Sequence, residues 1–422
     1  MARNLRVGIQ RGLRQSIGGG FGTGDIFTLS PASFDFSRTN TKDSRITFTR
    51  ASTGTYVGAD GLIKTASTNE ARFDHDPATG ESLGLLIEKA STNKNTYSLF
   101  DDWSTTNISI KSTNNLAPDG TNTALMIGDS TGSATSSYIK KVINVVGSGK
   151  HVFSFYAKGT TANQSAFVDY YDAGGNRARG GISLDDGSTT NNLLEFGDAV
   201  ITSTDAGNGW WRCQLTLTPA GNTLYQWRVG NNDSGDIYVW GAQLEPASFS
   251  TSYIPTSGST VTRATDTAEI TGTNFSGFFN QSEGTIFFEN AQNNLTNIPF
   301  AYDFSDGTTN NSHRFLYIST INPVPIKVRT KVSNANITDI SFTAPSVGQF
   351  QKTAYGYKAN DFALSVNGAN VLTDTNGAVP TVINKLTIGD AFSGVNAFSG
   401  HIKRLAYFPT RQPNATLQSI TS

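Results

Sequence analysis

The sequence predicts an all-β protein in which tandem β-sandwiches follow an extended N-terminal arm. Three observations support this fold class. Short runs that alternate apolar with polar residues recur along most of the chain, and Gly, Ser, Thr and Asn cluster between them. No comparably long stretch has the 3.6-residue period of a helix. With 422 residues, the chain is long enough for two or three domains, each with its own core.

Composition excludes several classes of partner. Charged residues make up 15% of the chain and the formal net charge is -1, so no overall field attracts nucleic acid. No apolar run reaches the length of a membrane span, and the first residues lack the apolar stretch of a secretory signal. We therefore expect no nucleic-acid partner, no membrane insertion, and assembly in a cytoplasm. The single cysteine, Cys213, excludes an intrachain disulfide and is expected to be buried.

Residues 1–29 form the arm, which combines positive charge with a glycine-rich neck. Its basic side chains are Arg3, Arg6, Arg11 and Arg14. Phosphate contacts would need more charge, interleaved with aromatic residues, to indicate nucleic-acid binding. We expect the arginines to pair with carboxylates of an acceptor protein, which makes the arm an attachment device.

Residues 30–95 are predicted to be a small β connector region. Short extended runs alternate there with turn residues, and Ile46 and Phe48 share one face of the first clear run. A loop at residues 74–80 contains Pro and Gly, and a strand is expected from Leu83 to Glu88.

Residues 96–265 are predicted to form the first sandwich. In the run 151–158, Phe153 and Phe155 are expected in the core, with Tyr156 and Lys158 facing water. The run 211–217 alternates in the same way, with Cys213 among its inward residues.

Four motifs of this block carry a family resemblance. They are WSTTNISI, HVFSFYAKG, GNGWWRCQLTL and GDIYVWGAQLEPASFSTSYIPT. Together they resemble the family 4/9-type carbohydrate-binding modules, which implies a jelly-roll sandwich. One internal similarity is also visible, because Gly84 to Glu88 resembles Gly241 to Glu245, and an Ala-Ser pair lies one residue beyond each run. A single similarity does not make a repeat protein.

Residues 266–422 are predicted to form the second sandwich. Strands are expected at 285–289, 314–318 and 361–366, and Asn367-Gly368 predicts a hairpin turn because both residues tolerate positive φ. The motifs EGTIFFE, KTAYGYKANDFALSVNGANV and FSGHIKRLAYFPTRQPNATLQSIT resemble the concanavalin A-like, laminin-G type sandwich. This resemblance implies a final strand followed by a short closing helix.

Residues 45–93 carry the resemblance that bears most on function. The run RITFTRASTGTYVGADGLIKTASTNEARFDHDPATGESLGLLIEKASTN resembles a segment of virion structural proteins from tailed bacteriophages. It implies a virion location, contacts with other tail or capsid proteins through the arm, and a fibre or spike subunit that adheres to a host-surface glycan. A capsid decoration or head-fibre protein is the alternative, and a polysaccharide-degrading tailspike is the second alternative. Such fibres imply a homo-oligomer, for example a trimer, although no heptad or collagen repeat specifies three chains.

Aromatic side chains at strand ends and turns are the candidate glycan-stacking residues. They are Trp103, Tyr171 and Trp210, because exposed ring faces pack against pyranose faces while neighbouring polar groups select hydroxyls. The alternative for each is an ordinary packing or interface residue.

No catalytic residue is assigned, and we expect the protein not to be an enzyme. Glu283 and Glu289 share one predicted strand, where six residues at about 3.3 Å each separate them by roughly 20 Å. Paired glycosidase carboxylates lie only about 5 to 9.5 Å apart. A tailspike hydrolase is further disfavoured because no β-helix repeat is visible.

Two acidic turns are candidate calcium sites. They contain Asp185 with Asp186, and Asp303 with Asp306. Calcium needs six or more oxygen ligands, and each turn supplies two carboxylates, so an ordinary turn is the alternative. No cofactor is expected apart from such a structural calcium ion.

Overall fold

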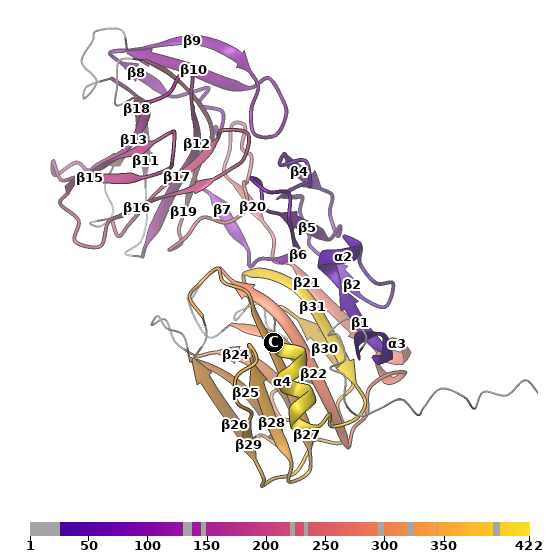
Figure 1. Cartoon of the computed structure of the whole chain (residues 1–422). Coiled ribbons are helices and arrows are strands. Elements are labelled where there is room, and N and C mark those ends of the chain that lie inside the picture. Colours follow the sequence, from indigo (N-terminus) through magenta and orange to yellow (C-terminus); the bar gives the residue numbers. More distant parts are fainter. Residues whose placement is uncertain are drawn as a thin grey trace, which may run out of the picture.

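A computed structural model describes residues 26–129, 137–144, 149–219, 224–231, 235–293, 299–318, 325–343, 345–390 and 397–422 (Figure 1). Within this part of the chain, the predicted all-β class with tandem sandwiches is confirmed. The predicted arm and its four arginines lie outside the described residues, apart from the last four positions of the 1–29 segment.

The central sandwich pairs two six-stranded antiparallel sheets. The first, here called the face sheet, has the order β15-β14-β13-β18-β11-β8. Its strands are β8 (Ser104–Thr106), β11 (Tyr138–Asn144), β13 (Ser165–Tyr171), β14 (Arg177–Ser183), β15 (Thr189–Leu194) and β18 (Leu224–Asn231). The second, here called the back sheet, has the order β16-β17-β12-β19-β10-β9. Its strands are β9 (Ile108–Asn115), β10 (Ala124–Asp129), β12 (His151–Gly159), β16 (Val200–Asp205), β17 (Trp211–Leu217) and β19 (Asp236–Glu245).

Alternating side chains from both sheets fill the central core. Phe153 and Phe155 of β12 and Cys213 of β17 are fully buried there, as predicted. The prediction that Tyr156 faces water is wrong. Its ring lies on the other face of the back sheet, packs against Trp240 and Tyr253, and is only 6% exposed. The returning segment around residue 253 covers that face, which alternation within one strand could not reveal.

The C-terminal sandwich pairs an eight-stranded sheet with a seven-stranded one. The larger sheet has the order β29-β28-β27-β22-β31-β6-β5, and β1 also pairs with β31. Its strands are β1 (Ala32–Asp35), β5 (Arg72–His75), β6 (Ser82–Ile87), β22 (Glu283–Gln292), β27 (Gln351–Lys358), β28 (Phe362–Val366), β29 (Leu372–Asp374) and β31 (Gly400–Phe408). The smaller sheet has the order β2-β21-β30-β23-β24-β25-β26. Its strands are β2 (Thr47–Thr49), β21 (Thr267–Thr271), β23 (Phe300–Ser305), β24 (Ser312–Tyr317), β25 (Pro325–Val332), β26 (Ala335–Thr343) and β30 (Lys385–Ile388).

The segment predicted as a connector contributes strands to both of these sheets. Two N-terminal strands pair one after the other along the same edge of β31. Strand β6 pairs with residues 400–402, and β1 pairs with residues 404–407. Strand β2 pairs with β21 in the other sheet. Phe34 and Phe48 enter the same core as the C-terminal strands. The predicted boundary at residue 95 therefore falls between strands that belong to the same sandwich. Strands β1, β2, β5 and β6 lie before it, and the C-terminal strands with which they share sheets lie after it.

Two small sheets and four short helices complete the described chain. The small sheets pair β3 (Gly54–Val57) with β4 (Ile63–Ala66), and β7 (Ser91–Asn93) with β20 (Val261–Arg263). The helices are η1 (Phe27–Leu29), α2 (Phe36–Thr39), α3 (Gly272–Ser276) and α4 (Asn414–Thr421). Helix α4 packs on β27 and β28 (Figure 1), where Leu417 and Ile420 are buried. This is the closing helix that the family resemblance implies.

The hairpin predicted at Asn367-Gly368 is confirmed. Asn367 has φ of 47° and Gly368 has φ of 72°, as the turn requires. The Ala369 N–H donates to the Val366 carbonyl at 2.8 Å across the turn, and β28 pairs with β29 beyond it.

Candidate functional site

Three rows of side chains cross the outer face of the face sheet in register. Because alternate residues of a strand point to the same side, the pairing of β14, β13, β18 and β11 aligns them. The middle row contains Arg179, Asp169, Arg228 and Lys140, one from each strand. The flanking rows contain Arg177, Tyr171, Gln226 and Val142 on one side, and Gly181, Phe167, Gly230 and Tyr138 on the other. We call these residues the outer-face cluster.

Asp169 is the electrostatic centre of the cluster. Its side chain is fully buried although it lies on the outer side of the sheet. Arg177 covers it by donating to both carboxylate oxygens at 2.7 to 3.1 Å, and Arg228 donates to Oδ2 at 3.4 Å. The hydrogen bonds that Arg177 donates to Asp169 raise the pKa of Arg177. One carboxyl group thus holds two guanidinium groups in fixed positions.

Aromatic rings alternate with these cations. The Arg228 guanidinium lies 4.6 Å from the ring centroids of both Tyr138 and Tyr171. The Arg179 guanidinium lies 3.6 Å from the Phe167 centroid, at a distance typical of cation–π contacts. Phe167 itself crosses Gly230, where a Cβ atom would lie only 2.4 Å from the ring. Glycine at this position lets the ring lie flat on the sheet.

The chemistry of the outer-face cluster suits an acidic, hydroxyl-rich ligand. Four cationic side chains accompany a single carboxyl group, so the face carries local positive charge although the whole chain is nearly neutral. Guanidinium groups bind carboxylates in bidentate fashion. Half-buried Tyr138 and Tyr171 add apolar ring surface and hydroxyl groups beside those donors.

Two of the three predicted stacking residues are buried, and the third lies on the outer face of the face sheet. Trp103 is 8% exposed and packs against Phe100 and Phe153 in the central core. Trp210 is 3% exposed and packs near Tyr238. The prediction that these two tryptophans offer exposed ring faces is wrong, because both rings pack inside hydrophobic clusters. Only Tyr171 lies on an accessible face, within the outer-face cluster.

Sequence reasoning missed most of the outer-face cluster. The sequence does contain a pattern that indicates such a face. Asp169 and Tyr171 lie two residues apart on β13, and Arg177 and Arg179 lie two residues apart on β14. Only the register between strands shows that these pairs are neighbours.

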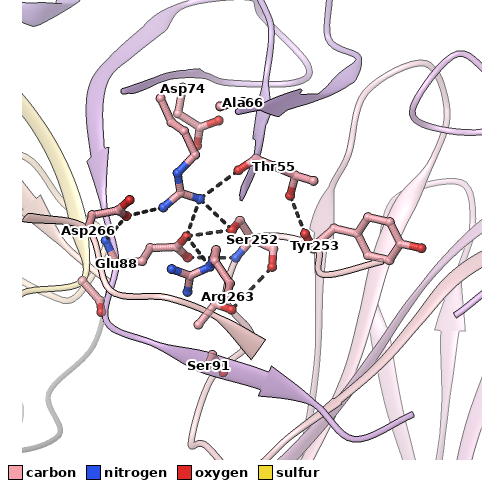
Figure 2. Close-up of polar contacts among 12 residues, drawn as sticks. Thr55, Ala66, Asp74, Glu88, Ser91, Ser252, Tyr253, Arg263 and Asp266 are labelled. Carbon is pink, nitrogen blue, oxygen red and sulfur yellow. Dashed lines mark hydrogen bonds and ion pairs between the residues drawn. The ribbon is translucent and has the colours of Figure 1, made fainter. Parts of the chain in front are cut away.

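A second set of polar residues joins the N-terminal segment to both sandwiches (Figure 2). Arg72 of β5 donates to Glu88 at 2.7 Å and also bonds Asp266. Arg50 donates to Asp266 at 3.1 Å, and Arg263 Nε lies 3.5 Å from Glu88 Oε2. All five side chains are at most 6% exposed. We call this set the junction network.

The charges of the junction network stabilise one another. Burial alone would raise the pKa of Glu88, but Arg263 and Arg72 outweigh burial and lower it well below its usual range. Burial alone would likewise lower the pKa of Arg72, but Asp266 and Glu88 raise it. Both groups therefore stay charged in the interior.

The internal sequence similarity has a structural counterpart here. Glu88 accepts hydrogen bonds from the Ser252 N–H at 2.8 Å and the Ser252 hydroxyl at 2.7 Å. Glu245 accepts from the Thr251 N–H at 3.0 Å and the Thr251 hydroxyl at 2.5 Å. Two glutamates in similar sequence contexts thus accept hydrogen bonds from consecutive residues of one segment.

The calcium candidates are engaged in other contacts. Asp303 is fully buried and accepts a hydrogen bond from Arg314 Nε at 2.8 Å. The Arg314 guanidinium therefore already pairs with this carboxylate, and the prediction that Asp303 binds calcium is wrong. Asp306 accepts from the Thr308 N–H and hydroxyl, and Asp186 from the Ser188 N–H. Asp185 accepts from the Asn163 N–H at 2.7 Å. Across the described ranges, no group of three or more His, Cys, Asp or Glu side chains could hold a metal ion.

The described part of the chain contains no helix that is long and apolar enough to cross a membrane.

Comparisons with known proteins find partial similarity only. No family model matches the sequence, and no curated protein matches it. Among solved structures, a K499G mutant of the NanB sialidase from Streptococcus pneumoniae is 14% identical over 36% of this chain, with a TM-score of 0.31. The match spans only 26% of the sialidase.

Other matches are to isolated domains. The CBM40 of the Ruminococcus gnavus IT-sialidase, bound to α2,3 sialyllactose, is 13% identical over 35% of this chain and 87% of its own, with a TM-score of 0.29. Domain 4 of AbnA, a GH43 extracellular arabinanase from Geobacillus stearothermophilus in complex with arabinotriose, is 12% identical over 37% of this chain and 73% of its own, with a TM-score of 0.30. At these scores the similarities carry no inference about function.

Proposed function

We propose that this chain is a structural protein of a tailed-phage virion, a fibre or spike subunit that adheres to acidic glycans on the host surface through the outer-face cluster. The observation that carries the adhesive role is the middle row of the cluster, in which Arg179 and Arg228 flank the buried Asp169 carboxyl group and Lys140 follows Arg228, beside half-buried tyrosine rings. The virion assignment rests on the resemblance of residues 45–93 to phage structural proteins.

The junction network supports a role in rigid display. Buried charges lose much of their stabilisation when one partner is displaced, so the network resists separation of the N-terminal segment from either sandwich. A protein that holds a binding face away from a particle benefits from such a joint. The arm, with Arg3, Arg6, Arg11 and Arg14, is the proposed attachment device to other virion proteins.

We further propose that the protein binds glycan without cleaving it. Glu283 and Glu289 both belong to β22, and Glu283 accepts a hydrogen bond from the Arg411 N–H at 3.1 Å. An adhesin must leave its glycan uncleaved to stay attached, whereas a tailspike enzyme shortens its receptor.

The adhesive role can be tested with the full chain and oligogalacturonate as an acidic probe, with maltooligosaccharide of equal length as the neutral comparison. Isothermal titration calorimetry should show binding of the acidic oligomer that weakens as salt increases. Arg228→Gln should weaken binding by about 10-fold or more, since a charge-assisted hydrogen bond contributes about 1.5 to 3 kcal/mol.

Arg329→Gln is the matched control, because Arg329 pairs with Asp339 on the C-terminal sandwich, far from the cluster in the fold. Equal affinity of wild type and Arg228→Gln would reject the cluster as the binding face. No binding of acidic or neutral glycan at millimolar concentration would favour the capsid decoration or head-fibre alternative. Shortening of the oligomer, seen by mass spectrometry, would favour the tailspike.

The attachment role needs a separate test. Deleting residues 1–24 should leave soluble, folded protein that is absent from purified particles. Normal incorporation of the truncated chain would contradict the role of the arm.

A further inference from the structure

An open cavity of about 160 Å³ lies at the junction of three parts of the chain. Residues 55–57 and Asp74 of the N-terminal segment form one side, and residues 249–253 form another. Tyr156 and Arg212 of the back sheet, with His401 of β31, complete it. We call it the junction pocket. It is separate from the outer-face cluster, since its central-sandwich residues belong to the other sheet.

One wall of the junction pocket is a fixed acid–imidazole pair. His401 Nε2 lies 2.8 Å from Asp74 Oδ2, and the Val57 N–H donates to Asp74 Oδ1 at 2.6 Å. Both side chains are 12 to 13% exposed. Each carboxylate oxygen keeps a further lone pair that can accept a hydrogen bond.

A second group of lining residues offers donors with unused capacity. Arg212 Nη2 donates to the Thr251 carbonyl at 2.7 Å and to the Ser154 hydroxyl at 3.2 Å. Its Nε is buried and has no hydrogen-bond partner among the described residues. Tyr156 lines the same cavity and adds a phenol hydroxyl group to these donors. A buried donor left unpaired is unfavourable, so a ligand that satisfies it gains affinity.

The remaining lining is apolar. Val57, Leu86 and Phe249 contribute hydrocarbon and ring surface next to these polar groups. Directed donors and acceptors that alternate with apolar surface match a ring that has hydroxyls at its edge and C–H groups on its faces. A sugar hydroxyl group both donates and accepts hydrogen bonds, so it can donate to Asp74 and accept from Tyr156.

We propose that the junction pocket binds one neutral pyranose ring, either as a free monosaccharide or as the terminal residue of a glycan. A closed cavity of about 150 Å³ accepts benzene. The junction pocket has a similar volume of about 160 Å³ and is open, so it can hold the ring while the outward hydroxyl groups remain in solvent. The acceptor pair of Asp74 disfavours an acidic sugar, in contrast to the outer-face cluster. This inference rests on the proposed glycan-binding function and adds a second, chemically different subsite to it.

The test uses the full chain and four methyl pyranosides (glucoside, galactoside, mannoside and N-acetylglucosaminide) in saturation-transfer difference NMR. We expect at least one to bind with a millimolar dissociation constant. Tyr156→Phe should weaken that binding about 3- to 10-fold, since it removes one hydrogen-bonding group and keeps the ring that packs on Trp240 and Tyr253. Val57→Trp, which fills the cavity from its half-buried rim, should abolish it.

Tyr97→Phe is the matched control, because it removes the same hydroxyl group from a half-buried ring that belongs neither to the junction pocket nor to the outer-face cluster. It should leave pyranoside binding unchanged. Binding of no pyranoside at 50 mM (about ten times the expected constant) would overturn the proposal, and so would binding that survives Val57→Trp in a variant with wild-type thermal unfolding. Retained binding of oligogalacturonate in those experiments would show that the proposed function stands while the junction pocket fails.

Discussion

At the residue scale, the buried charges are the feature that sets this chain apart from a simple apolar sandwich. Arg50, Arg72, Glu88, Arg263 and Asp266 carry three positive and two negative charges in the interior. Such a group contributes little net stability relative to an apolar core, yet it is very sensitive to loss of one member. It therefore specifies how the segments meet more than it strengthens the fold.

Asp266→Asn tests this sensitivity. Removing the charge leaves Arg50 and Arg72 facing each other in the interior, so the free energy of unfolding should fall by about 3 to 5 kcal/mol. Urea denaturation measures the change. Asp339→Asn removes a carboxylate from the half-exposed pair with Arg329 and Lys327 and should cost less than about 1 kcal/mol. Equal losses for the two variants would contradict a special role of the junction network.

His313 predicts how stability depends on pH. It is fully buried, stacks on Tyr357 at 3.9 Å, and bonds Thr330 through Nδ1. Burial lowers its pKa from 6.5 to about 3. Between these values the unfolded chain binds a proton that the folded chain does not, so stability rises with pH and is lost as pH falls below 6.5.

The measurement compares wild type with His313→Phe by urea denaturation at several pH values. The stability of wild type relative to the variant should fall by about 1.4 kcal/mol per pH unit below 6.5. Parallel pH profiles of the two proteins would show that His313 takes up its proton without unfolding.

At the element scale, the N-terminal segment approaches the C-terminal sandwich closely where β6 pairs with β31. Gly84 of β6 has φ of 86°, and a Cβ atom there would lie 2.2 Å from the Ile402 carbonyl oxygen. Only glycine permits both the backbone conformation and this approach. The pairing of two segments more than 300 residues apart thus depends on one missing side chain.

Gly84→Ala should therefore destabilise the protein more than the same change at another left-handed glycine. Gly272 has φ of 59°, and no atom lies within 4 Å of the position that a Cβ atom would take. Gly272→Ala therefore reports conformational strain alone, about 1 kcal/mol. Gly84→Ala should cost about 1 to 3 kcal/mol more, from overpacking. Thermal and urea unfolding of both variants would reveal this difference, and similar losses would mean that β31 shifts easily.

At the scale of the whole molecule, the chain returns to its beginning. The N-terminal segment supplies β1, β5 and β6 to one C-terminal sheet and β2 to the other. Strand β31 would have an unpaired edge without them, and such edges promote aggregation. The segment also supplies Phe34, Phe36, Ile46 and Phe48 to the shared core.

Residues 266–422 alone should accordingly fail to form a stable sandwich. We expect loss of cooperative unfolding and binding of a hydrophobic dye, in contrast to residues 26–422, because a substantial part of the core and one sheet edge become exposed. Cooperative unfolding of the shorter fragment with the midpoint of the longer one would show that the segment is an accessory.

The sequence by itself determined the all-β class, the faces of strands such as β12 and β17, the Asn367-Gly368 hairpin and the closing helix. These features depend on neighbours within one or two strands, so alternation, turn chemistry and short motifs contain the necessary information. Only the tertiary structure decided that Trp103 and Trp210 are covered, that Arg177, Asp169 and Arg228 meet on one face, and that residues 30–95 join the C-terminal sheets. These outcomes depend on strand register and on contacts between residues far apart in the chain, which no local pattern encodes.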